Sequence, residues 1–142
     1  MPDRPVVDQV NLVVADMEAS LAFYRLLGVE VGPTADAWAP HHRSAPAGLD
    51  LDFDSAAFAA WWNRGAKGPG VVVGFRLPSR AAVDETFAAV TAAGYGTQQE
   101  PVDAFWGARF AVVEDPDGNA VSLMSPVDQA LRRPPPDPPA SG

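Results

Sequence analysis

The sequence contains no cysteine, which excludes disulfide bonds and thiolate chemistry. It also has no apolar run near the roughly 20 residues that a membrane-spanning helix needs, and no basic start that leads into an apolar stretch of the secretory type. Basic residues are scarce: ten Lys and Arg stand against 18 Asp and Glu, so the net charge is −8. We therefore expect a cytoplasmic protein that has no membrane or nucleic-acid partner.

The remaining composition is that of an ordinary globular protein. Its 142 residues suffice for one domain or for two small modules that share a core, and 47% of them are hydrophobic. The acidic excess is compatible with a cationic ligand, although negative charge that only maintains solubility also explains it.

The first part of the chain predicts a strand, a helix and the start of a second strand. Residues 6–14 are rich in β-branched side chains, which is typical of a strand. Asp16 is placed to cap a helix over residues 17–27, and Gly28 is placed to end it. A further strand is expected at residues 29–31.

Acidic residues alternate with apolar ones in the next predicted strand. The stretch 36–47 is expected to hold one strand and a loop. Residues 49–54 then alternate strictly, so Asp50, Asp52 and Asp54 share one face of a strand.

The second part of the chain repeats the same order of elements. Residues 71–77 predict a strand, Ser79 is placed to cap a helix through residue 93, and Gly94 is placed to end it. Further strands are expected near residues 95–99, 109–114 and 119–125.

Three motifs near the ends of the chain resemble a known superfamily. Residues 10–16 read Val-Asn-Leu-Val-Val-Ala-Asp, residues 23–28 read Phe-Tyr-Arg-Leu-Leu-Gly, and residues 115–119 read Asp-Pro-Asp-Gly-Asn, a hairpin turn. Together they resemble the vicinal oxygen chelate superfamily, which includes glyoxalases, extradiol dioxygenases and bleomycin resistance proteins. In character the chain is similar to the metal-free, bleomycin resistance-like members.

The resemblance implies an α+β fold in which two βαβββ modules form curved mixed sheets around a cavity. It implies a single domain over residues 1–128, with module one at about 5–55, a linker at about 56–69 that can include a short helix, and module two at about 70–126. It also implies a homodimer. Residues 129–142 are rich in proline and predict a disordered or polyproline-like tail, with a proline motif for a partner as the alternative.

The resemblance also places the metal ligands of the enzymatic members. A His usually stands seven residues before the helix-capping Asp, where this chain has Gln9. A His or Glu usually stands three residues before Phe75, which is Val72, and a Glu usually follows Gly118 by four residues, which is Ser122. Valine has no donor atom, and Gln and Ser are neutral ligands that do not balance a divalent charge.

Other residues offer little compensation for these losses. Asp50 or Asp52 could supply a fourth ligand, but one carboxylate without a supporting His is a poor site. The adjacent His41 and His42 would point to opposite faces of a strand, so we expect them on a loop or the surface. We therefore predict no metal and no cofactor.

Polar residues on otherwise apolar strands are the candidate ligand-binding residues, because apolar strand residues should face the helices. These candidates are Gln9, Asn11, Asp50, Asp52, Arg76, Arg109 and Ser122. Trp38 and Trp106 lie in predicted loops and are expected to contact a flat or cationic ligand. Trp61 and Trp62 are expected in the core or in a dimer contact.

The sequence leaves three functions open. The favoured one is a metal-free protein that binds, and so sequesters, an aromatic or cationic small molecule such as an antibiotic. The alternative is a glyoxalase-like lyase, isomerase or epimerase that acts on a small metabolite. Its catalytic residues are unknown, and Asp50, Asp52, Glu100 or His42 could serve as its base. The third is a regulatory module without small-molecule chemistry.

Overall fold

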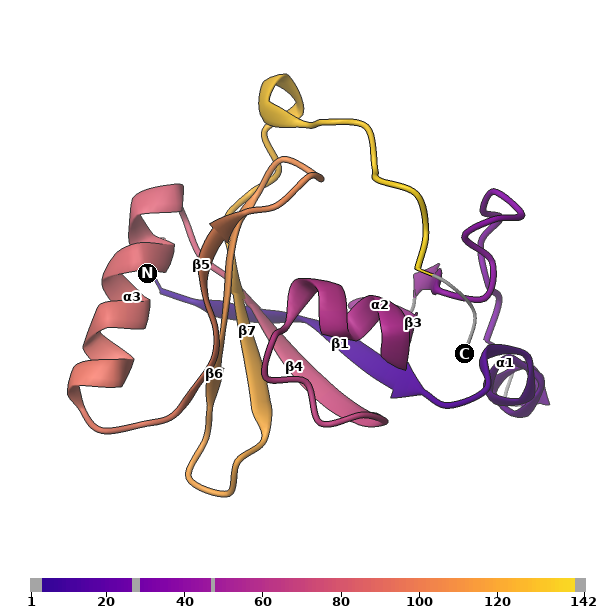
Figure 1. Cartoon of the computed structure of the whole chain (residues 1–142), viewed down its shortest axis with the longest axis horizontal. Helices are drawn as coiled ribbons and strands as arrows, with labels where there is room; N and C mark the ends of the chain where they lie inside the picture. The colour runs from indigo at the N-terminus through magenta and orange to yellow at the C-terminus, as the bar shows by residue number, and fades with distance from the viewer. Residues whose placement is uncertain (1–3, 27–28, 47, 140–142) are drawn as a thin grey trace.

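The computed structural model describes residues 4–26, 29–46 and 48–139, and these residues form one seven-stranded mixed sheet with three α-helices (Figure 1). The first half of the chain contributes β1 (Val6–Val14), α1 (Met17–Leu26), β2 (His42–Pro46), β3 (Asp50–Ser55) and α2 (Ala56–Trp62). The second half contributes β4 (Gly70–Arg76), α3 (Arg80–Ala92), β5 (Thr97–Asp103), β6 (Arg109–Glu114), β7 (Ala120–Met124) and a short 3₁₀ helix (Gln129–Leu131). This is the α+β fold with a curved mixed sheet that the sequence predicted.

The strand order β2-β3-β1-β4-β7-β6-β5 joins the two halves at the centre of the sheet. The first strands of the halves, β1 and β4, pair antiparallel there. Each of them pairs in parallel with the last strand of its own half, β1 with β3 and β4 with β7. The two halves therefore have the same arrangement around a central line between β1 and β4.

The helices cover both faces of the sheet. On the outer face of the sheet, Met17 and Leu21 of α1 pack with Phe53 of β3. On the same face, Val83 of α3 packs with Leu77 and Leu123. On the other face, Ala59 of α2 packs with Val13 and Val72. Figure 1 shows α2 inside the curve of the sheet and α3 outside it. None of the described helices is long and apolar enough to cross a membrane.

The predicted helix starts are confirmed by their caps. The Ala19 backbone N–H donates to Asp16 Oδ1 at 3.0 Å, and the Ala82 N–H donates to Ser79 Oγ at 3.1 Å. Gly94 follows α3 with a φ of +97°, a conformation that glycine adopts freely. The predicted end of the first helix at Leu27 and Gly28 lies outside the described residues.

The strand predicted at residues 29–31 is wrong. The hydrogen bond to β2 in this region comes from the next residue, where the Gly32 N–H donates to the Ser44 carbonyl at 2.8 Å. Val29 and Val31 still pack against the core under α1, which explains their strand-like pattern. Pro33 has no N–H to continue a ladder. The short helix expected within the linker is α2.

Candidate functional site

The inner face of β1 carries amide side chains where the outer face is apolar. Leu12 and Val14 pack under α1, so by the alternation of a strand Gln9 and Asn11 face the other way. A shift in the pairing with β4 between Val7 and Gln9 marks a bulge at the start of this stretch. Gln9 and Asn11 line a cleft on the inner face.

The three aspartates of β3 extend this polar surface. Asp50 lies beside Gln9 and Asp52 lies beside Asn11 in the parallel pairing of β1 and β3. Leu51 and Phe53 lie between them and pack on the α1 side. The alternation predicted from the sequence therefore holds, and the three carboxylates of Asp50, Asp52 and Asp54 line the cleft.

Asp52 is buried, with 7% of its surface exposed, and it accepts hydrogen bonds from two sides. Gln9 Nε2 donates to its Oδ2 at 2.5 Å, and Ser44 Oγ of β2 donates to its Oδ1 at 2.7 Å. Burial raises the pKa of Asp52 above its ordinary value, and the neighbouring Asp54 charge adds to this rise. The hydrogen bonds from Ser44 and Gln9 and the nearby His42 offset the rise only in part.

Asp54 is completely buried and forms a pair with His42. His42 Nδ1 lies 2.5 Å from Asp54 Oδ1, and Asn11 Nδ2 donates to Asp54 Oδ2 at 2.7 Å. Burial lowers the pKa of His42, but the hydrogen bond to Asp54 and the charges of Asp54 and Asp52 outweigh it, so the pKa is raised overall. His42 therefore pairs with Asp54, whereas the structure gives Asp50 and Asp52 no ion pair with the described residues.

Aromatic rings form a further wall of the cleft. Trp38 packs edge-on against Phe58 of α2 with ring centroids 5.0 Å apart. Trp106 packs edge-on against both Phe105 and Phe110, at 5.2 and 5.4 Å. These rings and Trp62 line the same cavity as the carboxylates. A cation held beside the carboxylates would be attracted by the faces of the rings in this wall.

The cleft has a volume of about 540 Å³, which is within the range of sites for small organic molecules. Its lining combines the carboxylates of β3 with aromatic rings. Its lining consists of Gln9, Asn11, Thr34, Trp38, His42, Ser44, Asp50, Asp52, Asp54, Phe58, Trp62, Phe105, Trp106, Phe110, Met124, Val127, Arg132 and Pro135.

Residues 126–139, which we call the C-terminal strap, contribute the last part of this lining. Figure 1 shows the strap running from β7 toward the side of β2 and β3. Val127, Arg132 and Pro135 of the strap line the cleft. Arg132 brings a positive charge to the same cavity as the carboxylates of β3. The predicted disorder of residues 129–142 stays a prediction.

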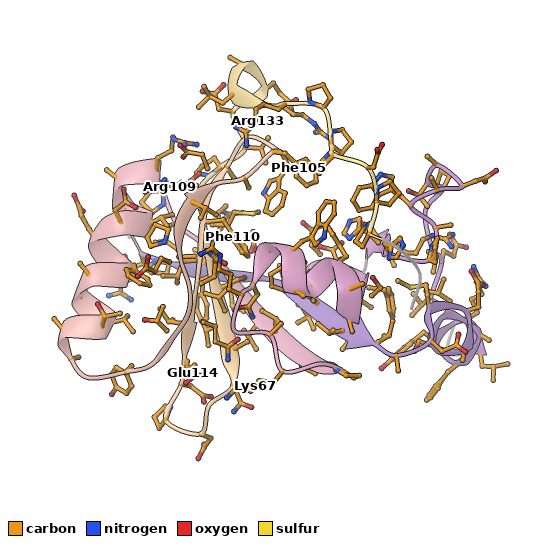
Figure 2. The ribbon with its side chains drawn as sticks, viewed as in Figure 1. Lys67, Phe105, Arg109, Phe110, Glu114 and Arg133 are labelled. Carbon is orange, nitrogen blue, oxygen red and sulfur yellow. The ribbon has the colours of Figure 1, made fainter. Side chains whose placement is uncertain are left out.

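Backbone contacts hold the strap against the loop between β5 and β6. The Asp128 N–H donates to the Gly107 carbonyl at 2.9 Å, and a Cβ at position 107 would lie 2.5 Å from the Asp128 carbonyl oxygen. The Arg133 N–H donates to the Phe105 carbonyl at 2.8 Å, and Figure 2 shows these two residues side by side. Arg133 Nη2 also donates to the Asp103 carbonyl at 3.0 Å.

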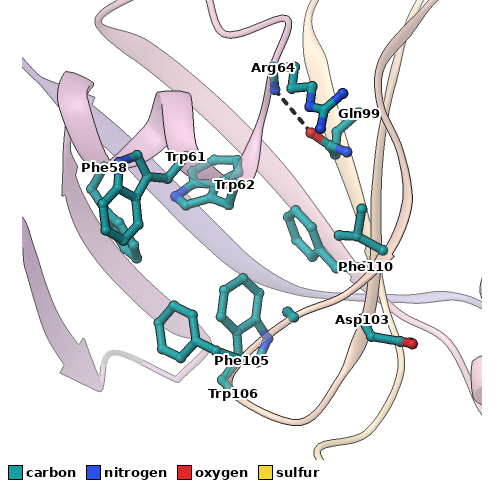
Figure 3. A pocket seen from close by; sticks show the side chains of 11 residues that line it. Phe58, Trp61, Trp62, Arg64, Gln99, Asp103, Phe105, Trp106 and Phe110 are labelled. Atoms are coloured by element: carbon teal, nitrogen blue, oxygen red, sulfur yellow. Dashed lines mark hydrogen bonds between the residues drawn. The ribbon is translucent and has the colours of Figure 1, made fainter. Parts of the chain in front are cut away.

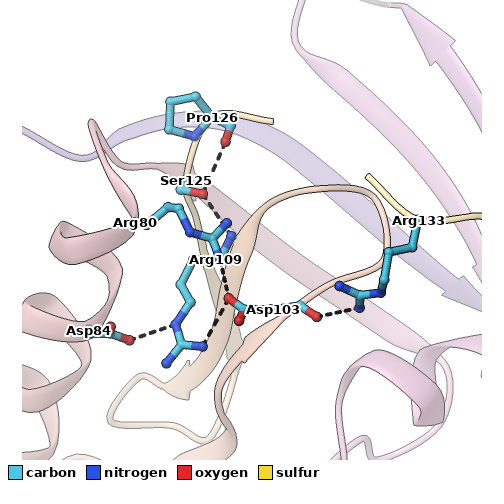
Figure 4. Close-up of polar contacts among 7 residues, drawn as sticks. All are labelled: Arg80, Asp84, Asp103, Arg109, Ser125, Pro126 and Arg133. Atoms are coloured by element: carbon cyan, nitrogen blue, oxygen red, sulfur yellow. Dashed lines mark hydrogen bonds and ion pairs between the residues drawn. The ribbon is translucent and has the colours of Figure 1, made fainter. Parts of the chain in front are cut away.

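Asp103 ties this loop to the outer helix as well (Figure 4). Its Oδ1 accepts hydrogen bonds from Arg80 and from Arg109 Nη1, the latter at 3.2 Å. Arg109 Nε in turn donates to Asp84 of α3 at 3.0 Å. These ion pairs are largely exposed, so we expect them to position the loop rather than to add much stability.

The residues at the family's metal positions do not fit a divalent ion. Pairing across β3, β1, β4 and β7 aligns Asp50, Gln9, Gly74 and Ser122 in one row. Gly74, rather than Val72, therefore faces Gln9 and Ser122, because the bulge in β1 sets this register. Only one member of the row, Asp50, has a carboxyl group, and the described residues hold no group of three His, Asp or Glu side chains that could bind a metal.

The structure brings most of the predicted binding residues together. The six that line the cleft are Gln9, Asn11, Trp38, Asp50, Asp52 and Trp106. Ser122 lies on the same face but is buried, with 3% of its surface exposed, next to Gly74. Arg76 is largely exposed, and its Nη1 lies 3.5 Å from Asp8 Oδ2, outside the cleft lining.

Arg109 is not on the concave face as the sequence had suggested. Its guanidinium lies on the α3 side, where it bonds Asp84. Phe110 faces the cleft instead. The rule that apolar residues face the helices does not hold for β6, because both of its faces are buried: Ala111 and Val113 pack under α3, and Phe110 and Val112 pack on the inner side.

The sequence did not identify several residues of the cleft. His42 was expected on a loop or the surface, or as one of four possible bases, and it lies on β2 opposite Asp54. Asp54 continues the alternation of Asp50 and Asp52, so the signal for it was present. The stretch 36–47 was expected to hold one strand and a loop, but no local signal specified the pairing of β2 with β3 that brings Ser44 and His42 to the carboxylates.

This geometry defines a paired-module α+β protein with a polar cleft on the inner face of one continuous sheet. A comparison with protein families matches residues 6–123 to the glyoxalase/bleomycin resistance protein/dioxygenase superfamily. The match spans most of the chain, and the protein belongs to this superfamily. No curated protein sequence matches the chain.

Solved structures with the same fold come from several bacteria. The NAD-dependent benzaldehyde dehydrogenase from Legionella pneumophila matches with a TM-score of 0.64 and 20% identity, over 83% of this chain and 97% of that chain. A superfamily member from Vibrio splendidus 12B01 matches with a TM-score of 0.58 and 16% identity, over 86% and 99%. The methylmalonyl-CoA epimerase from Mycobacterium tuberculosis matches with a TM-score of 0.56 and 16% identity, over 87% and 89%. At these identities the similarity establishes the fold alone.

Proposed function

We propose that the protein binds a small organic cation with an aromatic part in the inner cleft, without a metal ion. The observation that supports this most is that Asp50 and Asp52 line the same cavity of about 540 Å³ as a wall of aromatic rings. Carboxylates attract the cation by charge, and the rings attract it through their π faces. An antibiotic is one ligand of this class, and sequestration of it needs only tight binding.

Asp52 is the side chain that this proposal makes most important. Its carboxylate is buried and its pKa is raised, so a bound cation would relieve an unfavourable buried charge. Asp50, by contrast, is exposed near the entrance and attracts the ligand from solvent. Ser44 and Gln9 occupy only part of the acceptor capacity of Asp52, because a carboxylate has about four lone-pair sites.

The test is calorimetric titration with benzyltrimethylammonium, read in parallel by tryptophan fluorescence. We expect saturable binding, and we expect Asp52→Asn to weaken it by about tenfold, as for one lost charge-assisted contact. Glu85→Gln removes the same charge from the exposed surface of α3 and serves as the matched control. Equal affinity in the wild type and in Asp52→Asn would contradict the proposal, as would no binding at all.

A second candidate function is metal-free acid–base catalysis on a small metabolite, of the lyase, isomerase or epimerase type. The observation that favours it is the His42 imidazole, which a buried Asp54 holds by Nδ1 at the wall of the cleft. Its test is exchange of a carbon-bound proton of small carbonyl compounds for deuterium in D₂O, followed by NMR. Exchange that is abolished by His42→Gln supports catalysis, whereas no exchange by the wild type leaves binding as the function.

We also propose that the protein is a cytoplasmic homodimer. Helix α1 exposes apolar side chains, among them Phe23 and Leu26, which are 52% and 88% exposed. Analytical ultracentrifugation at micromolar concentration tests the dimer, and a single species of the 15.0 kDa chain would contradict it.

A further inference from the structure

A second, smaller hollow lies behind the aromatic wall of the cleft (Figure 3). It has a volume of about 240 Å³ and lies between α2 and the loop that follows β5. Its lining consists of Phe58, Trp61, Trp62, Arg64, Gln99, Val102, Asp103, Ala104, Phe105, Trp106 and Phe110. We call this hollow the rear pocket. Of its residues, the sequence predicted a ligand contact for Trp106 and a core or dimer contact for Trp61 and Trp62.

Two of the polar side chains around the rear pocket, Asp103 and Gln99, are already engaged, and the third charged or amide side chain, that of Arg64, is exposed. Asp103 directs its carboxylate to Arg80 and Arg109 on the outer side, and Figure 3 shows it pointing away from the rings. Gln99 Oε1 accepts the Arg64 backbone N–H at 3.1 Å, and Gln99 Nε2 donates to the Glu100 carbonyl. The pocket therefore gives a cationic group few partners, and burial of an unpaired positive charge there would be costly.

Aromatic rings supply most of the surface that remains. Trp62 and Trp106 pack edge-on against Phe110, with centroids 5.7 and 5.4 Å away. Trp106 Nε1 donates to Met124 Sδ at 3.2 Å, so its indole N–H also has a partner. A wall of rings favours another ring, stacked or edge-on, over an aliphatic chain.

The size of the rear pocket also fits a ring. An apolar cavity of roughly 150 Å³ is enough to bind benzene, and the rear pocket at about 240 Å³ is larger than that. It is smaller than the usual range of about 300 to 1,000 Å³ for a complete small-molecule site. It therefore suits one part of a ligand rather than a whole ligand.

The rear pocket and the cleft share one layer of side chains. Five rings line both hollows, and these are Phe58, Trp62, Phe105, Trp106 and Phe110. Only a single layer of side chains therefore separates the acidic cleft from the rear pocket. A rotamer change in one ring of a loop, such as Phe105, would connect them.

We infer that the rear pocket is a subsite for the aromatic ring of the cleft's ligand, so the ligand class is an organic cation that carries a ring on a flexible spacer. This inference rests on the proposed function, because the cationic head is bound by Asp50 and Asp52 in the cleft. The ring passes the shared aromatic layer and packs against Trp61 and Trp62. Trp61 belongs to the rear pocket and is outside the cleft lining.

The experiment is a calorimetric titration with a graded series of cations. Tetramethylammonium has the cationic head without a ring. Benzyl-, phenylethyl-, phenylpropyl- and phenylbutyl-trimethylammonium add a ring on a spacer of increasing length. We expect affinity to rise in a step at the spacer length that allows the ring to reach the rear pocket. Trp61→Ala should reduce the affinity of the members beyond the step by about 3- to 10-fold, as for the loss of one aromatic contact. It should leave tetramethylammonium binding unchanged.

Tyr95→Ala is the matched control. Tyr95 is 47% exposed and Trp61 is 44% exposed, and Tyr95 lies outside both hollows. Val102→Trp, which fills the rear pocket from β5, is the second variant and should abolish the step. Circular dichroism and thermal unfolding confirm that each variant folds before it is titrated.

The outcomes separate this inference from the proposed function. If tetramethylammonium binds and Asp52→Asn weakens it, but affinity rises smoothly with spacer length and Trp61→Ala has no selective effect, the rear pocket is not a subsite. If no cation binds, or if Asp52→Asn has no effect on the head group, the proposed function itself is wrong.

Discussion

The pair of His42 and Asp54 has a measurable effect on stability near neutral pH. The pKa of His42 is raised above its ordinary value of 6.5, because contact with Asp54 outweighs the effect of burial. A raised pKa means that the folded state holds the proton more tightly, so the stabilisation is complete below the ordinary value. It is lost as the pH rises through the raised value.

We therefore expect the free energy of unfolding to fall more steeply above neutral pH in the wild type than in His42→Gln. Urea unfolding at intervals from about pH 6 to 9 measures this difference, because the titration of an ordinary His is centred near 6.5. NMR titration of the His42 ring gives the pKa directly. Parallel stability curves for the two proteins would contradict the assignment.

Gly74 occupies the crowded centre of the sheet. A Cβ there would lie 2.9 Å from Gln9 Cβ and 3.0 Å from Ser122 Oγ. We predict that Gly74→Ala destabilises the protein by about 1 to 3 kcal/mol, as overpacking of a core usually does. At Gly32 the nearest contact of an added Cβ is 3.4 Å, so Gly32→Ala is the control and should cost less than about 0.5 kcal/mol. Chemical denaturation of both variants measures their free energies of unfolding and so compares the two losses of stability.

At the scale of elements, the strap holds the loop that carries Phe105 and Trp106. Arg133 Nη2 donates to the Asp103 carbonyl, whereas the neighbouring Arg132 lines the cleft. We predict that Arg133→Ala increases amide hydrogen exchange in residues 104–107 by about fivefold, which corresponds to one lost hydrogen bond. Arg132→Ala changes the same charge and should leave this exchange unaltered. An equal response of the two variants would show that charge, and not the hydrogen bond, holds the loop.

The elements that the sequence predicted well are those whose signals are local. The caps at Asp16 and Ser79, the stop at Gly94 and the alternation of the β3 aspartates each depend on a few neighbouring residues. These local signals, together with the family resemblance, gave the fold and one wall of the cleft.

The features that the sequence missed depend on contacts between distant segments. His42 reaches Asp54 only through the pairing of β2 with β3, and the register of β4 against β1 follows from a bulge. The face of Arg109 was wrong because β6 is apolar on both sides. The rear pocket requires α2 and the loop after β5 to meet, which no local pattern specifies.

At the scale of the whole molecule, the chain has the superfamily's fold, and the part of it that the structure describes holds no group of three His, Asp or Glu side chains suited to a metal. We expect no stoichiometric metal by elemental analysis of protein purified without chelator or affinity tag. We also expect addition of Ni, Zn, Mn or Fe ions to leave the unfolding temperature unchanged, because a ligand that binds only the folded state would raise it. One tightly bound metal per chain would show that other side chains rebuild the site.

The central pairing of β1 with β4 has a consequence for how the chain folds. It joins residues as far apart in sequence as Val6 and Arg76, and it brings Gln9 and Asp50 of one half next to Gly74 and Ser122 of the other. Long-range pairing of this kind closes a large loop before it gains contacts, so it is slow. In refolding experiments we expect helical signal to return first and ligand binding to return only with the slowest phase, when the two halves have joined.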